Sequence, residues 1–271
     1  MAHVVYDNFY LSNEVEDQFD SHLDLMRFCT VDRTLEGTAG MKRLVNVYAA
    51  TNGTEKLGIG EGNSKSIEVG YTQREYEIEL AQNRFVWNDE EAMKDPMLVP
   101  TGMKHAGTDM YNTVNSDVFG EFEKAPESQT VTTTTYDFDA FADAVALLDL
   151  PENREDVEVF GWVSRKAKAA IRKTLKDQLK YVEAFARHGY VGTVCGVNLY
   201  DKRNAKDNEI CIGTKNAVTA FTKKGTEVEV VSKNTRSAED ANVRKNTAFS
   251  RKYYVVALTN ETQVAKIALN A

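Results

Sequence analysis

The chain has 271 residues, of which 42% are hydrophobic and 27% are charged, a composition typical of a globular protein with a sizeable core. Its 33 basic and 41 acidic residues give a net charge of −8, which excludes a protein that grips nucleic acid over its whole surface but still allows a local basic stripe. No apolar run reaches the roughly 18 residues of a membrane-spanning helix, and the acidic N-terminus does not resemble a signal peptide. Cys29, Cys195 and Cys211 form no C-x-x-C pair, which favours reduced thiols in a cytosolic setting.

The first 90 residues predict an arm followed by a hairpin. Residues 1–40 include a possible amphipathic helix at 13–28, but the segment is too polar to hold a core alone. Residues 41–50 predict a strand, and residues 51–65 are rich in glycine and asparagine, as a mobile loop tip is.

Residues 66–88 predict a second and longer strand, in which two apolar alternations differ in phase. Their members are Ile67, Val69 and Tyr71, and then Tyr76, Ile78 and Leu80. Because side chains alternate strictly along a strand, the change of phase predicts a bulge between Tyr71 and Tyr76. The two strands together make a ribbon that is marginally stable alone in water, so we expect it to rest on something else, most simply a neighbouring copy.

The pattern changes to helical period at residues 97–124. The apolar positions, three and four apart, are Met103, Gly107, Met110, Val114, Val118 and Phe122. Pro126 ends this helix. Gly102, Gly107 and Gly120 either weaken it or allow close packing.

The remaining residues mix helices and strands. Asp137 caps a helix, residues 157–162 predict a short strand, and Ser164 caps a basic helix that runs to Arg187 and is closed by Gly189. Strand patterns follow at residues 190–200, 209–212, 217–221, 226–231, 252–258 and 263–269. The last two flank residues 259–262 and predict a hairpin. The chain is therefore of the α+β class.

No pattern predicts a catalytic, cofactor-binding or metal site. Gly58, Gly60 and Gly62 precede a strand rather than a helix and lack the Lys-Ser/Thr pair of a phosphate loop, so they indicate a loop tip. Four histidines are present, and none has a partner at ligand spacing: His3, His22, His105 and His188. The acidic run 89–91 indicates a solvated turn rather than a catalytic pair.

The helix that begins after Ser164 has a strongly basic face over an apolar line. The basic residues are Arg165, Lys166, Lys168, Arg172, Lys173, Lys176 and Lys180, and the apolar ones are Ala167, Ile171, Leu175, Leu179 and Val182. Two interpretations remain open, namely a solvated face over a packed stripe, or a surface that touches DNA or acidic patches of a neighbouring copy. The mixed charge of the whole chain makes contacts between copies the more natural of the functional targets.

This order of parts resembles the Hong Kong 97-type shell fold of tailed-bacteriophage major capsid proteins. Three segments also resemble that family in sequence: Gly192-Thr-Val-Cys-Gly-Val-Asn-Leu-Tyr, Glu209-Ile-Cys-Ile-Gly-Thr-Lys-Asn-Ala-Val and Arg251-Lys-Tyr-Tyr-Val-Val-Ala-Leu. The resemblance covers nearly the whole chain, through loose patterns rather than fingerprints.

The resemblance implies a division of the chain into functional parts. Residues 1–40 would be an N-terminal arm, 41–90 the extended β-hairpin loop, 91–136 a peripheral domain with the long spine helix, and 137–215 the axial domain. Residues 216–271 would be C-terminal strands that return to the peripheral domain.

The implied function is self-assembly into an icosahedral head shell around phage double-stranded DNA, with no enzymatic activity and no cofactor. The implied partners are copies of the chain in pentamers and hexamers, a separate scaffolding protein (unless assembly needs none), portal and decoration proteins, and non-specifically held DNA, but no membrane. The implied location is the virion capsid, assembled in the bacterial host cytoplasm. Some family members cross-link Lys to Asn, and nothing in the sequence shows whether Lys56 or Lys65 does so.

Three other functions compete with this one. An encapsulin-like nanocompartment shares the fold but packages enzymes. Tail-tube and decoration proteins are usually β-dominated and would not need a helix at 97–124. An enzyme would need titratable residues gathered in one pocket, which the spacing does not predict.

Overall fold

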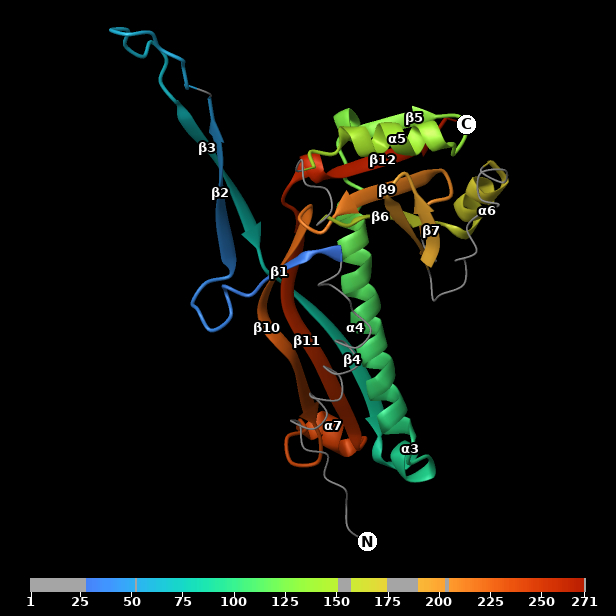
Figure 1. Cartoon of the computed structure of the whole chain (residues 1–271). Helices are drawn as coiled ribbons and strands as arrows, with labels where there is room; N and C mark the ends of the chain where they lie inside the picture. Colours follow the sequence, from blue (N-terminus) through green and yellow to red (C-terminus); the bar gives the residue numbers. More distant parts are fainter. Residues whose placement is uncertain (1–27, 52, 151–156, 175–189, 203–204, 271) are drawn as a thin grey trace.

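The computed structural model describes residues 28–51, 53–150, 157–174, 190–202 and 205–270 (Figure 1). The helix expected at 13–28, apart from its last residue, and the part of the basic helix beyond residue 174 lie outside the described residues, as do Pro151 and Gly189. The described strands form a four-stranded sheet, a six-stranded sheet and a separate two-stranded ribbon.

The four-stranded sheet is long and is covered on one face by a single helix. Its order is β1 (Thr30–Asp32), β10 (Val218–Val231), β11 (Lys245–Leu258) and β4 (Glu79–Asn88), with only β1 parallel to its neighbour. Helix α4 (Leu98–Phe122) runs along β4 and β11 (Figure 1), and the short α3 (Asp89–Lys94) links β4 to it. The predicted helix at 97–124 is confirmed, and all six of its predicted apolar positions are buried.

Strand β11 is longer than the sequence indicated. Its first half carries Asn246, Ala248 and Ser250 on the buried side, so it lacks the apolar alternation by which strands are recognised. The two segments expected around Gly225 form the single strand β10, whose pairing with β11 shifts register between Thr222 and Glu227. The break between the two predicted segments is therefore a β-bulge inside one strand.

The six-stranded sheet has the order β5-β12-β9-β6-β8-β7. Its strands are β5 (Thr130–Thr133), β12 (Val264–Leu269), β9 (Glu209–Thr214), β6 (Val159–Val163), β8 (Val197–Asp201) and β7 (Tyr190–Val194). Helices α5 (Phe138–Leu147) and α6 (Arg165–Thr174) pack on one face, where the side chains of Val159 and Val163 point. Phe160 and Trp162 point to the other face and meet the C-terminal end of α4.

One expectation for this sheet is wrong. Residues 263–269 do not form a hairpin with 252–258, because β12 pairs with β5 and β9 and so belongs to the other sheet. The chain crosses between the sheets where the carbonyl oxygen of Ala217 accepts hydrogen bonds from the backbone N–H groups of Thr259 and Asn260, both at 3.0 Å. The strand pattern at residues 190–200 is divided into the β7–β8 hairpin, whose turn residues Cys195 and Gly196 have φ of 50° and 80°.

The ribbon pairs β2 (Lys42–Ala50) with β3 (Val69–Glu77) in unbroken antiparallel register. No bulge lies between Tyr71 and Tyr76, so that prediction is wrong: the two tyrosines lie in one unbroken ladder, and the strand is interrupted at the buried Ile78, whose N–H donates to the Met41 carbonyl at 2.7 Å. Beyond Ile78 the chain continues as β4 and pairs with β11, so the ribbon ends short of residue 90. Figure 1 shows the ribbon extending away from both sheets.

Candidate functional site

The described histidine, cysteine and acidic side chains are not gathered at one site. Within the described ranges, no group of three or more His, Cys, Asp or Glu side chains could hold a metal ion. His105 lies exposed on α4, whereas His3, His22 and His188 fall outside those ranges. Cys29, Cys195 and Cys211 are all free thiols. No described helix is long and apolar enough to cross a membrane.

The glycine-rich segment closes on itself rather than around an anion. The backbone N–H of Gly58 donates to a carboxylate oxygen of Glu61 at 2.8 Å, and the Glu61 N–H donates to the Gly58 carbonyl at 3.2 Å. Gly60, at the end of this turn, has a φ of 87°. The amide that a phosphate would need is therefore used by an acidic side chain, and the segment is a loop tip.

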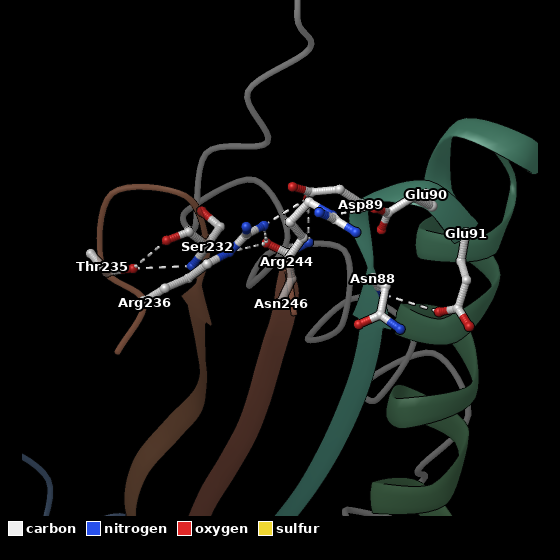
Figure 2. A network of polar contacts seen from close by, with 9 residues as sticks. All are labelled: Asn88, Asp89, Glu90, Glu91, Ser232, Thr235, Arg236, Arg244 and Asn246. Atoms are coloured by element: carbon white, nitrogen blue, oxygen red, sulfur yellow. Dashed lines mark hydrogen bonds and ion pairs between the residues drawn. The ribbon is translucent and has the colours of Figure 1, made fainter. Parts of the chain in front are cut away.

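The acidic run at residues 89–91 is more structured than a solvated turn (Figure 2). Asp89 accepts hydrogen bonds from the Arg236 guanidinium at 2.7 Å and from the Asn246 side chain at 2.8 Å. The Arg236 side chain is only 5% exposed. Its hydrogen bond holds the pKa of Asp89 below the usual value, and Asn246 adds to this.

This network ties the loop between β10 and β11 to the start of α3. Glu90 pairs with Arg244, and the Asn88 N–H donates to the Glu91 carboxylate at 2.9 Å, which is half of a capping box. The spacing Asn88-x-x-Glu91 was visible in the sequence, but the approach of Arg236 from 147 residues away was not. The network fixes the far end of the four-stranded sheet and has no geometry for catalysis.

A partly buried lysine lies where α4 meets the six-stranded sheet. The ammonium of Lys202 is 3.8 Å from the ring centre of Phe119. Burial lowers the pKa of this amine to about 8, although nearby Glu123 opposes the shift. The surrounding cavity measures only about 10 Å³, so it has no room for a substrate.

The ribbon is the most unusual surface of the molecule, because its apolar side chains are not covered. Tyr48 and Tyr71 face each other across the two strands with ring centres 6.0 Å apart, and they are 64% and 67% exposed. Other exposed apolar residues of the ribbon and its tip are Leu44, Val47, Leu57, Ile59, Ile67 and Val69. Contiguous exposed apolar surface of this kind marks an interaction site.

The base of the ribbon is attached to the body. The Tyr76 ring stacks on Phe221 with centres 5.0 Å apart. Arg74 pairs with Glu261 at 3.1 Å, and Arg43 pairs with Asp32 at 3.5 Å. These contacts set the direction of the ribbon, which extends away from both sheets beyond them (Figure 1).

Helices α6 and α5 begin at the caps that the sequence predicted, and α6 carries a basic face. The start of the predicted basic face is present on α6, where Arg165, Lys166, Arg172 and Lys173 are exposed while Ala167 and Ile171 are buried. The Ser164 hydroxyl accepts from the Ala167 N–H at 3.1 Å, which confirms the predicted cap. Asp137 caps α5 in the same way, through Ala140 at 2.9 Å.

No protein-family model and no curated protein matches this sequence. Solved structures do match the fold. The capsid of the cyanophage P-SCSP1u matches with a TM-score of 0.70 at 12% identity, over 90% of this chain and 87% of that one. The capsid of Ralstonia phage GP4 matches with a TM-score of 0.69 at 11% identity, over 88% and 86%. A virus-like particle from Pyrococcus furiosus matches with a TM-score of 0.61 at 14% identity, over 95% and 97%.

The chain therefore has the α+β shell-protein fold of these capsids, as the resemblance to the Hong Kong 97 type implied. The likeness extends over most of each chain, so it concerns the whole architecture rather than one motif. At these low sequence identities, the likeness shows the fold alone.

Proposed function

We propose that the chain is the major capsid protein of a tailed bacteriophage, a non-enzymatic subunit that assembles into the head shell. The observation that carries the proposal is the ribbon, whose apolar side chains, Tyr48 and Tyr71 among them, have no cover within the described chain. The match to several tailed-phage capsid structures supports the same conclusion. Burying such surface against a neighbour supplies about 25 cal/mol per Å².

The parts of the subunit then have distinct roles. The ribbon is the extended loop that overlaps the next copy, α4 is the spine of the peripheral domain, and the six-stranded sheet is the axial domain that faces the local five- or six-fold axis. Residues 1–40 serve as the arm. Many weak heterologous contacts of this kind close into a shell, and their number compensates for their individual weakness.

The remaining partners belong to the same proposal. Portal, scaffolding and decoration proteins join the shell, packaged double-stranded DNA is held without sequence specificity, and assembly takes place in the host cytoplasm before the virion is released. The net charge of −8 agrees with a subunit that encloses DNA rather than coating it.

Deletion of residues 51–65 tests the assembly role of the ribbon. We expect the wild-type protein to form closed shells in negative-stain electron microscopy, and the deletion variant to remain a soluble subunit. Circular dichroism and thermal unfolding of the variant should match those of the wild-type subunit, since the tip lies at the far end of the ribbon, away from both sheets (Figure 1). Normal shells from the variant would refute the role of the loop.

An encapsulin-like compartment is the second candidate, because the match with the virus-like particle from Pyrococcus furiosus spans 97% of that protein's chain. Its TM-score of 0.61 is lower than the 0.70 of the cyanophage capsid. Purified shells that contain a cargo enzyme instead of DNA would favour this candidate. A tail-tube protein is disfavoured by the 25-residue helix α4.

A further inference from the structure

The two helices that cover the six-stranded sheet carry opposite charges on their outer faces. Both bury their apolar sides in the same core cluster, so their remaining faces point away from the sheet. The outer side of α5 presents Asp139 and Asp143, and this helix contains no basic residue. The outer side of α6 presents Arg165, Lys166, Arg172 and Lys173, and the described part of this helix, Arg165–Thr174, contains no acidic residue.

The first turn of α6 carries basic residues where a helix is usually stabilised by acidic ones. A helix N-terminus favours acidic side chains, yet the first turn of α6 carries Arg165, Lys166 and Lys168. Asp207 pairs with Lys166 at 2.8 Å and Asp201 with Lys168 at 3.3 Å, which offsets two of these cations. A rule of local stability that is broken on an exposed face points to function rather than to folding.

Four of the exposed charges form no ion pair within the described part of the chain, namely Asp139, Asp143, Arg165 and Lys173. Asp139 gains some stability from the dipole of its own helix, because it lies in the first turn, whereas Asp143 lies beyond it. Next to these acids Phe138 is 48% exposed and adds apolar area to the same face.

The two charged faces lie over opposite halves of the sheet. Helix α5 packs on β12 and β5, at one edge. Helix α6 follows β6 and is drawn towards β8 by the ion pair of Lys168 with Asp201, on the side of the other edge, β7 (Figure 1). In a ring of identical copies, one side of each subunit meets the opposite side of the next.

We propose that the acidic face of α5 in one copy docks against the basic face of α6 in the adjacent copy of the same ring. This inference rests on the proposed shell function and names the surfaces that would hold neighbouring six-stranded sheets together. The partner is a second copy of this chain, chosen because the two faces are complementary and both belong to the subunit. Each exposed ion pair is weak by itself, but it recurs at every contact around the ring.

Reversing the charges tests this pairing. The variants are D139K/D143K, R165E/K173E and the quadruple variant that combines them. We expect each double variant to give more than about tenfold fewer shells than wild type by negative-stain counting and light scattering, because the attraction at each contact is lost in R165E/K173E and becomes repulsion in D139K/D143K. The quadruple variant should restore assembly, since it places two lysines on α5 opposite two glutamates on α6 and keeps the net charge of the chain.

A mixture of the two double variants gives a second readout. D139K/D143K carries two basic faces, whereas R165E/K173E keeps the acidic face of α5 and has an α6 face of mixed sign, because Lys166 and Arg172 remain. In an alternating mixture every second contact joins an acidic α5 to a basic α6, so the two variants should co-assemble better than either assembles alone. Alternation of two variants closes six-membered but not five-membered rings, and the mixture should therefore form sheets or tubes instead of closed shells. Circular dichroism of each subunit checks that the fold is intact.

Three results would overturn the inference. The double variants could assemble as wild type does, or the quadruple variant could fail like the doubles. R165E/K173E could form normal shells that contain less DNA, which would assign the basic face to nucleic acid. Failure of the wild-type protein to form shells even with its scaffolding protein present is a different outcome, which counts against the proposed function itself.

Discussion

Strands β3 and β4 are separated by one residue and have similar apolar alternation, yet one is exposed and the other is covered. Of the side chains on β3, Val69 and Tyr71 are exposed, whereas Trp87 at the end of β4 is buried under α4. The difference is the partner, because β3 pairs only with β2 while β4 pairs with β11 beneath a helix. An apolar alternation therefore predicts a strand but does not say whether the same chain supplies its cover.

Truncating the covered strand should have the largest effect. Trp87→Ala removes an indole that stacks on Phe85, with ring centres 5.1 Å apart, in a cluster with Met103 and Val228. We expect a loss of about 3–5 kcal/mol in the free energy of unfolding, measured by urea denaturation. Val69→Ala on β3 is the matched control and should change it by less than about 0.5 kcal/mol. Equal losses in the two variants would remove the contrast between the strands.

The sequence predicted what depends on local pattern and missed what depends on distant partners. The buried face of α4 and the caps Asp137 and Ser164 follow from spacing and residue type, and they were found. The exchange of partner at Ile78 depends on β11, which is paired with β4 more than 150 residues further along the chain. No local pattern reports that pairing, so the change of phase was assigned to a bulge.

Among the candidate surfaces too, those that depend on local sequence were predicted and those that depend on distant partners were not. The ribbon and its need for a neighbour were inferred from residues 41–88 alone, and the exposed tyrosines agree with that inference. The buried pair of Asp89 with Arg236 was not inferred, since the acids looked solvated by their own sequence context. The opposite charges of α5 and α6 became a pair of surfaces only when the sheet placed both helices on one face.

The contact of β4 with α4 can also be disturbed from the helix. A Cβ added at Gly102 would lie 2.3 Å from the ring of Phe85 on β4, so Gly102→Ala should cost about 1–3 kcal/mol through overpacking. Gly120 in the same helix has open space around it, and Gly120→Ala should stabilise by up to about 1 kcal/mol. Thermal unfolding of the two variants measures both effects. A stabilised Gly102→Ala would show that β4 is not held tightly against α4.

A smaller difference between the body and the ribbon should be seen in how the free energy of unfolding depends on pH. Burial lowers the pKa of Lys202 to about 8 in the folded chain, below the ordinary value of 10.5, so the unfolded chain binds more protons between these values. Stability should therefore rise with pH from about 8 upwards, and most clearly below pH 9, where the Cys211 thiol is still protonated in both states. Lys202→Met should remove this slope, as followed by denaturation at several pH values.

Lys42 on the ribbon provides the opposite sign. Its hydrogen bond to Glu75 raises its pKa, so any stability that it contributes is present at neutral pH and is lost as the pH rises above 10.5. The side chain is exposed, and Lys42→Met should leave the pH dependence between 8 and 9 unchanged. A lost slope in this variant, with the slope retained in Lys202→Met, would contradict the assignment.

The smallest effect on stability should accompany a large effect on assembly. Tyr48→Ser with Tyr71→Ser removes two rings that touch each other and little else in the subunit, so the free energy of unfolding should change by less than about 0.5 kcal/mol. Shell formation should fail in the same variant, because these rings are the largest apolar groups that the ribbon offers to a neighbour. Urea denaturation of the subunit and negative-stain imaging measure the two quantities separately. A variant that unfolds early but still forms shells would mean that the tyrosines support the ribbon and not its contact with the next copy.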